Sequence, residues 1–182
     1  MVDPATAMTI VIPKEYPMVL LGCVLLCCEV FVIPMFTVAK ARKEHFNEEF
    51  MKQFREEHEL ALGKDRRKDE LWFGFPDCGS GRFAQKLSYE AWVKFNNNQR
   101  VHQNMVEQLP IMLTILLISG LILPKITMYV AFLNVGARLL YTTLYVTLGS
   151  DWRKLGGIFG GLPLNLLMLA TIGILIYKVA TD

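Results

Sequence analysis

The sequence predicts an all-α, polytopic membrane protein, a bundle of four transmembrane helices, and three observations support this prediction. Of the 182 residues, 53% are hydrophobic and only 20% are charged, whereas about a quarter of the residues of a soluble domain are charged. Of the 36 charged residues, 24 lie between Lys40 and Asn104, so the rest of the chain is nearly free of charge. Four apolar stretches are each long enough to cross a bilayer core, which takes about 20 helical residues.

This composition excludes a soluble enzyme, a basic nucleic-acid-binding domain and a disordered tail protein. A net charge of +2 gives no reason to expect a nucleic-acid partner. The length predicts a single domain over residues 1–182.

Breaking or charged residues separate the four predicted spans. Pro17 opens the first, Lys40 to Lys43 stop it, and Pro124 with Lys125 makes a tight turn between the second and third. The spans cover residues 16–39, 105–123, 126–148 and 155–180. Backbone groups inside a bilayer must be satisfied within the segment, so we expect helices rather than strands.

One extended loop, at about residues 44–94, separates the first two spans. Between residues 45 and 63, Phe46, Phe50, Phe54 and Leu60 recur at a roughly helical spacing among acids and bases. This pattern predicts an amphipathic helix that lies on the membrane surface or on a partner. Residues 64–70 are all charged and predict a solvated loop.

The distribution of basic residues predicts the orientation. The first and third loops hold 15 Lys and Arg residues, and the opposite side holds only Lys14, Lys125 and Lys178. We therefore expect both loops on the cytosol-equivalent side and both termini on the other. The sequence predicts an endoplasmic reticulum or mitochondrial membrane without separating the two.

Two polar stripes occur at membrane depth, where charges are costly and need a reason. On a helix, Arg100, Asn104 and Glu107 share one face. Either they bind a ligand, or Arg100 and Glu107 form an interfacial ion network that ends the helix.

The second stripe lies on the third span, where Asn134, Arg138, Tyr141 and Tyr145 share a face. A mid-span arginine should face another helix or a watery cleft. The alternative is a structural ion pair between Arg138 and Glu29, the only acid of the first span.

Cations are expected at one level, the cytosolic ends of the helices. Arg42, Lys43, Arg100 and Arg153 would lie there with one carboxylate, an amide and two phenols. This set suits a small, multiply charged anion that also carries an ammonium group. The alternative is the ordinary excess of basic residues on the cytosolic side.

The fourth span carries two overlapping Gly-x-x-x-Gly pairs, formed by Gly156, Gly157, Gly160 and Gly161. Small residues at this spacing let helices approach closely in lipid. The sequence does not decide between two roles for these glycines: close packing within the subunit, or a groove that faces a partner.

The string Phe-x-x-x-Gln-Arg-x-His-Gln-Asn-x-x-Glu-x-x-Pro, from Phe95 to Pro110, resembles the signature of the MAPEG family, the membrane-associated proteins in eicosanoid and glutathione metabolism. Its Arg-x-His-Gln-Asn form is most similar to the type-three microsomal glutathione transferases. Ala41-Arg42-Lys43 and the stretch from Ala137 to Tyr145 resemble two further motifs of that family.

The resemblance implies a homotrimer of four-helix subunits, with glutathione as co-substrate between neighbours and no metal. It implies that Arg42, Arg100 and Tyr141 contact glutathione carboxylates and backbone, that Asn104 and Glu107 hold its γ-glutamyl end, and that Tyr145 lines the cleft. His102 occupies a position that is glutamine in the leukotriene-forming relatives. Arg153 would stabilise the thiolate. Lys154 is the alternative, because the loop at residues 149–152 matches the family pattern with an offset of one residue.

The sequence therefore predicts a membrane-bound glutathione transferase or peroxidase, which conjugates glutathione to lipophilic electrophiles or reduces lipid hydroperoxides. The alternative is a non-catalytic member of the family that acts as a structural subunit of a larger membrane complex. The extended first loop, with its amphipathic helix and the aromatic residues Trp72, Phe73, Phe75 and Trp92, favours this alternative.

Overall fold

The computed structural model describes residues 12–63 and 73–181, which form helices, turns and loops and contain no strand. The all-α prediction is confirmed. The predicted solvated loop at residues 64–70 lies outside the described residues. The α-helices are α1 (Tyr16–Phe36), α2 (Val38–His45), α3 (Glu48–Met51), α4 (Arg55–Leu62), α5 (Tyr89–Ile122), α6 (Pro124–Leu148) and α7 (Arg153–Thr181).

Three helical stretches of the described chain are long and apolar enough to span a membrane: Tyr16–His45, Tyr89–Ile122 and Ser150–Thr181. Large apolar side chains stand exposed on them, such as Phe31 at 84% and Ile176 at 65%, as expected for surfaces that face lipid. Together these features make the chain an integral membrane protein.

The helix α6 is long enough to span a bilayer, with 25 residues, but its most apolar stretch is less apolar than those of the other three long helices. Asn134, Arg138 and several hydroxyl-bearing residues lower its hydropathy. It packs against α1, α5 and α7, which gives these polar groups protein neighbours instead of lipid. The count of four spans therefore stays a prediction.

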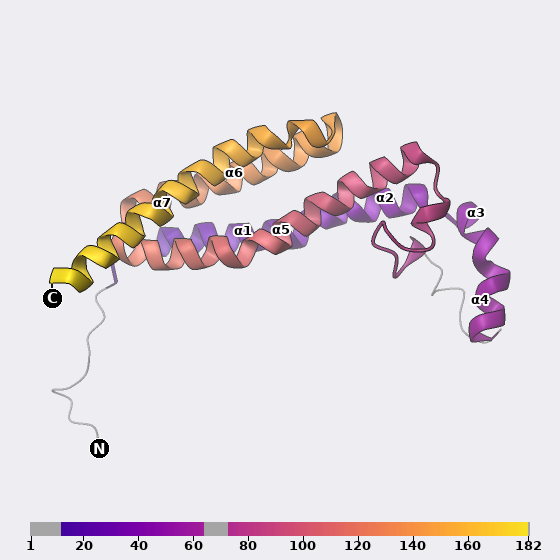
Figure 1. Cartoon of the computed structure of the whole chain (residues 1–182), viewed down its shortest axis with the longest axis horizontal. Coiled ribbons are helices and arrows are strands. Elements are labelled where there is room, and N and C mark those ends of the chain that lie inside the picture. Colours follow the sequence, from indigo (N-terminus) through magenta and orange to yellow (C-terminus); the bar gives the residue numbers. More distant parts are fainter. Residues whose placement is uncertain (1–11, 64–72, 182) are drawn as a thin grey trace, which may run out of the picture.

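In Figure 1 α1 runs along α5 and α6 runs along α7, and α6 also packs against α1 and α5. The start of α1 and the end of α7 lie at one end of the bundle. The first loop and the connection at residues 149–152 lie toward the other end. The α6–α7 pair diverges from the α1–α5 pair toward that connection.

The bundle core lies in the half nearer the termini, where buried apolar side chains from all four long helices meet, including Val19, Leu116, Ala131 and Leu167. A hydrogen bond between the Ser119 and Thr171 hydroxyls, 2.7 Å long, joins α5 to α7 in this region. Such small polar contacts stabilise helix pairs in lipid, where no hydrophobic force holds helices together.

The glycines of α7 divide between two environments. A Cβ atom built on Gly156 would lie 2.4 Å from Tyr141 Cβ, and one on Gly160 would lie 3.1 Å from Asn134 Oδ1, so these two glycines pack closely on α6. Gly157 and Gly161 have no atom within 4 Å of such a Cβ. One Gly-x-x-x-Gly pair thus packs within the subunit, and the other faces open space.

We expect Gly156→Ala to destabilise the protein by about 1–3 kcal/mol, because the new methyl group would overlap Tyr141 and its backbone. Thermal unfolding in detergent measures the effect. The matched control is Gly157→Ala on the next residue, which should unfold at about the wild-type temperature. Equal losses in the two variants would contradict the packing described for α7.

The first loop folds into a cap (residues 46–63 and 73–88) on the ends of α2 and α5. The predicted amphipathic helix is interrupted: α2 ends at His45, and Asn47 starts α3 by accepting a hydrogen bond from Phe50 N of 2.9 Å. Phe46 and Phe54 are buried and belong to one cluster with Phe95 of α5. These aromatic residues therefore form the interior of the cap rather than a membrane-facing or partner-facing stripe.

The carboxylate of Asp77 organises the second half of the cap. It accepts hydrogen bonds from the backbone N–H groups of Gly79, Gly81 and Ala84, at 2.8, 2.9 and 2.7 Å. Ser88 then caps α5 through a bond from Ala91 N, so this helix begins at Tyr89, well before the predicted start of the second span. The whole string from Phe95 to Pro110 is consequently helical.

Candidate functional site

Asn104 and Tyr141 meet between α5 and α6. Asn104 Nδ2 donates to Tyr141 Oη at 2.6 Å, and the ring of Tyr145 lies 5.5 Å from that of Tyr141. Both tyrosines are buried, next to Val101 and Met105 of α5. Of the predicted site residues, these three are brought together within the chain.

Three predicted charged residues lie at the surface. Arg100, Glu107 and Arg153 are exposed, and among the described residues Arg100 donates only to Gln103 Oε1, at 3.3 Å. No ion pair joins Arg100 to Glu107 within the described part of the chain, so the alternative of an interfacial ion network is not realised there. A single subunit therefore presents these charges on its outside.

Arg153 is the first residue of α7 and lies one turn before Gly156, the residue that packs on Tyr141. It thus stands near the tyrosines, at a helix N-terminus whose dipole favours negative charge. Lys154 follows it and is also exposed. The geometry within one chain does not separate these two candidates for the thiolate partner.

His102 lies half-buried on α5, and its Nδ1 accepts no hydrogen bond and donates none within residues 12–63 and 73–181. It precedes Asn104 by two positions, so on the helix it faces away from the Asn104–Tyr141 contact. The structure does not bring it into that group.

Arg42 binds the backbone of the cap. Its side chain is buried and donates to the carbonyl oxygens of Phe73, at 3.1 Å, and of Asp77. The guanidinium carbon also lies 4.2 Å from the centre of the Phe75 ring. Part of the Arg42 guanidinium therefore serves backbone carbonyls of the cap, and the expected contact between Arg42 and glutathione stays a prediction.

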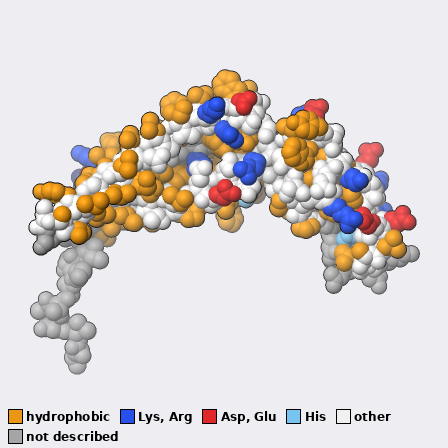
Figure 2. All heavy atoms as spheres, viewed as in Figure 1, with side chains coloured by type: hydrophobic (Ala, Val, Ile, Leu, Met, Phe, Trp, Pro, Cys, Tyr) orange, Lys and Arg blue, Asp and Glu red, His pale blue; other side chains and the backbone are white. Residues whose placement is uncertain are grey.

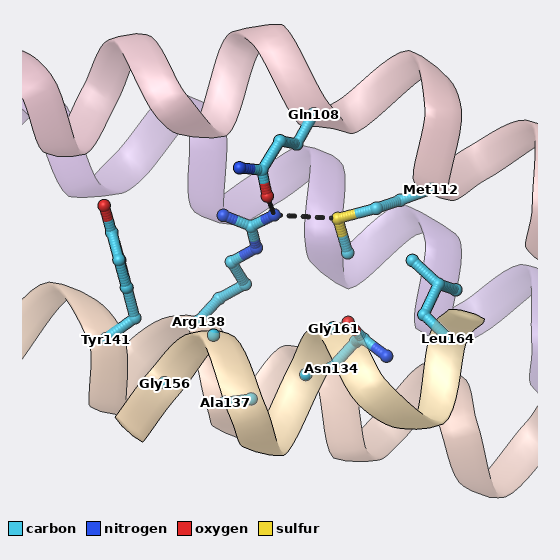
Figure 3. Close-up of a pocket in the computed structure, with 11 residues that line it drawn as sticks. Gln108, Met112, Asn134, Ala137, Arg138, Tyr141, Gly156, Gly161 and Leu164 are labelled. Atoms are coloured by element: carbon cyan, nitrogen blue, oxygen red, sulfur yellow. Dashed lines mark hydrogen bonds between the residues drawn. The ribbon is translucent and has the colours of Figure 1, made fainter. Parts of the chain in front are cut away.

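Arg138 lies on the wall of a cleft of about 250 Å³ between α5, α6 and α7. Figure 3 shows its side chain reaching across to α5, where Nη2 donates to Gln108 Oε1 and contacts Met112 Sδ at 3.0 Å. In the space-filling view the surface is hollowed between the two helix pairs, and Lys and Arg side chains gather around the hollow (Figure 2).

The alternative ion pair between Arg138 and Glu29 is not formed. Both carboxylate oxygens of Glu29 are buried and accept no hydrogen bond from any residue that the structure describes. The two side chains border the same small cavity, but Arg138 turns to Gln108 on the cleft side. Glu29 thus remains a buried carboxylate that lies near Arg138 but accepts no hydrogen bond in this part of the chain.

Two groups of residues that line the cleft were not among the predicted site residues. Gln108 and Met112 continue the four-residue spacing of Asn104 along one face of α5, so this spacing could have indicated them. Gly157 and Gly161 border the open space, but sequence alone could not tell which glycine pair would be packed and which open.

A family model described as the MAPEG family matches residues 19–173 of the chain. The match covers α5, α6 and the cap in full, and most of α1 and α7. No curated protein and no solved structure matches the chain.

Proposed function

Because this chain belongs to the MAPEG family, we propose that it is a membrane-bound glutathione transferase or peroxidase that acts on lipophilic electrophiles. The observation that carries the proposal is the hydrogen bond between Asn104 and Tyr141 beside the cleft. An amide and a phenol held together at the edge of a membrane cleft are suited to a small polar ligand.

The ligand that fits these groups is glutathione, a peptide with two carboxylates and one ammonium group. Arg100 would pair with a carboxylate, since guanidinium groups bind carboxylates with two parallel hydrogen bonds. Glu107 would pair with the ammonium group. Both side chains are exposed on a single subunit, which supports a site completed by a neighbouring copy in a homotrimer.

The chemistry proposed for this site starts with the glutathione thiol, whose pKa is roughly 8.5 in solution. A nearby guanidinium, proposed to be that of Arg153, lowers this pKa and favours the thiolate. The thiolate attacks an epoxide carbon, a C–S bond forms, the C–O bond breaks and the oxygen takes up a proton. In the peroxidase reaction two glutathione molecules reduce one hydroperoxide to an alcohol and water, and form one disulfide.

Replacement of the Tyr141 hydroxyl should weaken glutathione binding. We expect Tyr141→Phe to raise the Kd for glutathione about tenfold, because one hydrogen bond to the ligand and the contact with Asn104 are lost. Isothermal titration of the detergent-solubilised protein measures the Kd, and conjugation of a lipophilic electrophile measures the activity.

The matched control is Tyr129→Phe, at an exposed tyrosine on the same helix, which should bind glutathione as the wild type does. The proposed site would be wrong if both variants bound glutathione equally well. The proposed function would be wrong if the wild-type protein neither bound glutathione nor used it.

We also propose an endoplasmic reticulum or mitochondrial membrane, with the first and third loops on the cytosol-equivalent side. The positive-inside distribution of Lys and Arg supports this orientation. Both loops lie toward the same end of the bundle, as an arrangement of four spans requires.

A structural role in a larger membrane complex is the second candidate, and the exposed start of α5 beside the cap favours it. Tyr89 is 80% exposed and stacks on Trp92, with 6.0 Å between ring centres, at the start of α5. Exposed aromatic residues are enriched at protein interfaces. Purification in a mild detergent distinguishes the candidates: a large complex without glutathione affinity supports the scaffold, and a free trimer saturable by glutathione supports the enzyme.

A further inference from the structure

Glu29 is a buried carboxylate within the apolar helix α1. It is the only charged residue of that helix, and its side chain is only 8% exposed. Both carboxylate oxygens are shielded from solvent and accept no hydrogen bond from any residue that the structure describes. A buried polar group without a hydrogen bond is costly, so we expect a partner for these two oxygens.

The Glu29 side chain borders a small cavity between α1, α5 and α6, and Arg138 borders it from α6. The rest of the lining is apolar and comes from Leu26, Val30, Met105, Leu109 and Met112. The cavity has a volume of about 10 Å³. One buried water molecule needs roughly 10–15 Å³ and two to four polar partners, so the space suits a single water and no larger ligand.

Arg138 supplies hydrogen-bond donors at this cavity. Its Nη2 serves Gln108 Oε1 and Met112 Sδ, whereas Nε and Nη1 make no hydrogen bond within the described residues. The guanidinium and the Glu29 carboxylate are close enough to attract each other. A water molecule between them would accept a hydrogen bond from Arg138 and donate to Glu29. A metal cation in the same place would be repelled by the guanidinium.

Arg138 also separates this cavity from the larger cleft between α5, α6 and α7, because it lines both spaces. Figure 3 shows its side chain reaching across the cleft to Gln108 of α5. Glu29 is the only acidic residue that lines either space. The one counter-charge at the cleft cation thus lies behind it, on α1.

We propose that the cavity binds one water molecule, which bridges the Glu29 carboxylate to the Arg138 guanidinium and completes an ion pair between α1 and α6. Glu29 is then a positioning residue. It keeps Arg138 charged at membrane depth, where a cation needs a counter-charge, and it fixes the side chain that forms the cleft wall. This inference goes beyond the proposed function and holds with or without glutathione.

Two substitutions of Glu29 distinguish an ionised carboxylate from a neutral one. Glu29→Gln keeps the shape of the side chain but removes its charge, so Arg138 loses its counter-charge. We expect this full-length variant to unfold about 4–8 °C below the wild type in detergent. Glu29→Asp keeps the charge and leaves room for a second water, so it should unfold closer to the wild type than Glu29→Gln does.

The opposite order would overturn the proposal. If Glu29 were a neutral carboxyl group, the amide of Glu29→Gln would replace it with little loss, and the shorter side chain of Glu29→Asp would be the more harmful change.

A double variant tests whether the two residues act together. Arg138→Gln alone should also lower the unfolding temperature, because it leaves Glu29 without its partner. Glu29→Gln combined with Arg138→Gln removes both charges and should unfold above either single variant. The matched control combines Glu29→Gln with Lys125→Gln, at an exposed cation of the same helix, and its losses should add. Additive losses for Glu29 and Arg138 would overturn the proposal.

An experimental structure of the wild-type protein tests the water molecule itself and does not depend on the folding of any variant. We expect density for one water within hydrogen-bond distance of both Glu29 and Arg138. A direct contact between the two side chains, or an empty cavity in a map that shows other buried waters, would overturn the proposal.

Discussion

Arg42→Ala is expected to detach residues 73–86 from α2 and to lower the local stability of the cap by about 3–5 kcal/mol. The guanidinium donates to the carbonyl oxygens of Phe73 and Asp77, and hydrogen bonds from a charged group contribute about 1.5–3 kcal/mol each. Without Arg42 these carbonyls would lose their donor. The effect should appear as faster hydrogen exchange at the amides bonded to Asp77, those of Gly79, Gly81 and Ala84.

Lys40→Ala is the matched control, because Lys40 is exposed and lies two residues before Arg42. It removes a cation at the same level of the fold and should leave hydrogen exchange in the cap unchanged. If Arg42 instead served glutathione, Arg42→Ala would weaken glutathione binding and leave the exchange rates of the cap amides as in the wild type.

Arg153→Ala is expected to lower the thiolate fraction of bound glutathione about 10- to 30-fold near pH 7. A guanidinium can lower a thiol pKa by about 1–3 units, and its removal returns that pKa toward roughly 8.5. Because the thiol is charged when deprotonated, the thiolate would then form only as the pH rises well above neutrality. The ultraviolet absorbance of the thiolate on addition of glutathione measures this fraction.

Lys154→Ala is the companion variant, since Lys154 is the adjacent exposed cation at the start of α7. It should leave thiolate formation close to the wild-type level. A loss in Lys154→Ala together with a normal signal in Arg153→Ala would assign the role to Lys154. Normal thiolate signals in both variants would contradict thiolate stabilisation by the start of α7.

The sequence predicted the long helices well, because apolar length and breaking residues are local signals. The third predicted span, residues 126–148, differs from α6 only by two residues at its start. The second predicted span, residues 105–123, covers only the apolar part of its helix, since α5 extends from its N-cap at Ser88 through polar residues before it becomes apolar. The hydropathy pattern reports where lipid begins, not where a helix begins.

The fold of the cap could not be predicted from local sequence patterns, because its contacts join distant parts of the chain. Arg42 and Asp77 are 35 residues apart, and Phe46 packs against Phe95 across the whole loop. The regular spacing of Phe46, Phe50 and Phe54 indicated a helical face but not what that face would contact. The motif position of Arg42 likewise indicated a contact with glutathione. It could not indicate the carbonyl oxygens of Phe73 and Asp77, to which Arg42 donates in the folded chain.

Some contacts of the candidate site could be predicted from helical spacing, and others could not. The helical spacing of Asn104 on α5 and of Tyr141 and Tyr145 on α6 placed each residue on a defined face, and these faces meet. The partner of Arg138 depended on the relative rotation of three helices, which spacing does not determine. The side chain therefore lies toward Gln108 in the cleft rather than toward Glu29.

An experimental structure of the detergent-solubilised protein with saturating glutathione tests the proposed glutathione site most directly. We expect a trimer with glutathione density between neighbouring subunits, in contact with Arg100, Asn104, Glu107 and Tyr141. An empty site in a well-ordered assembly, at a glutathione concentration that saturates related enzymes, would contradict it.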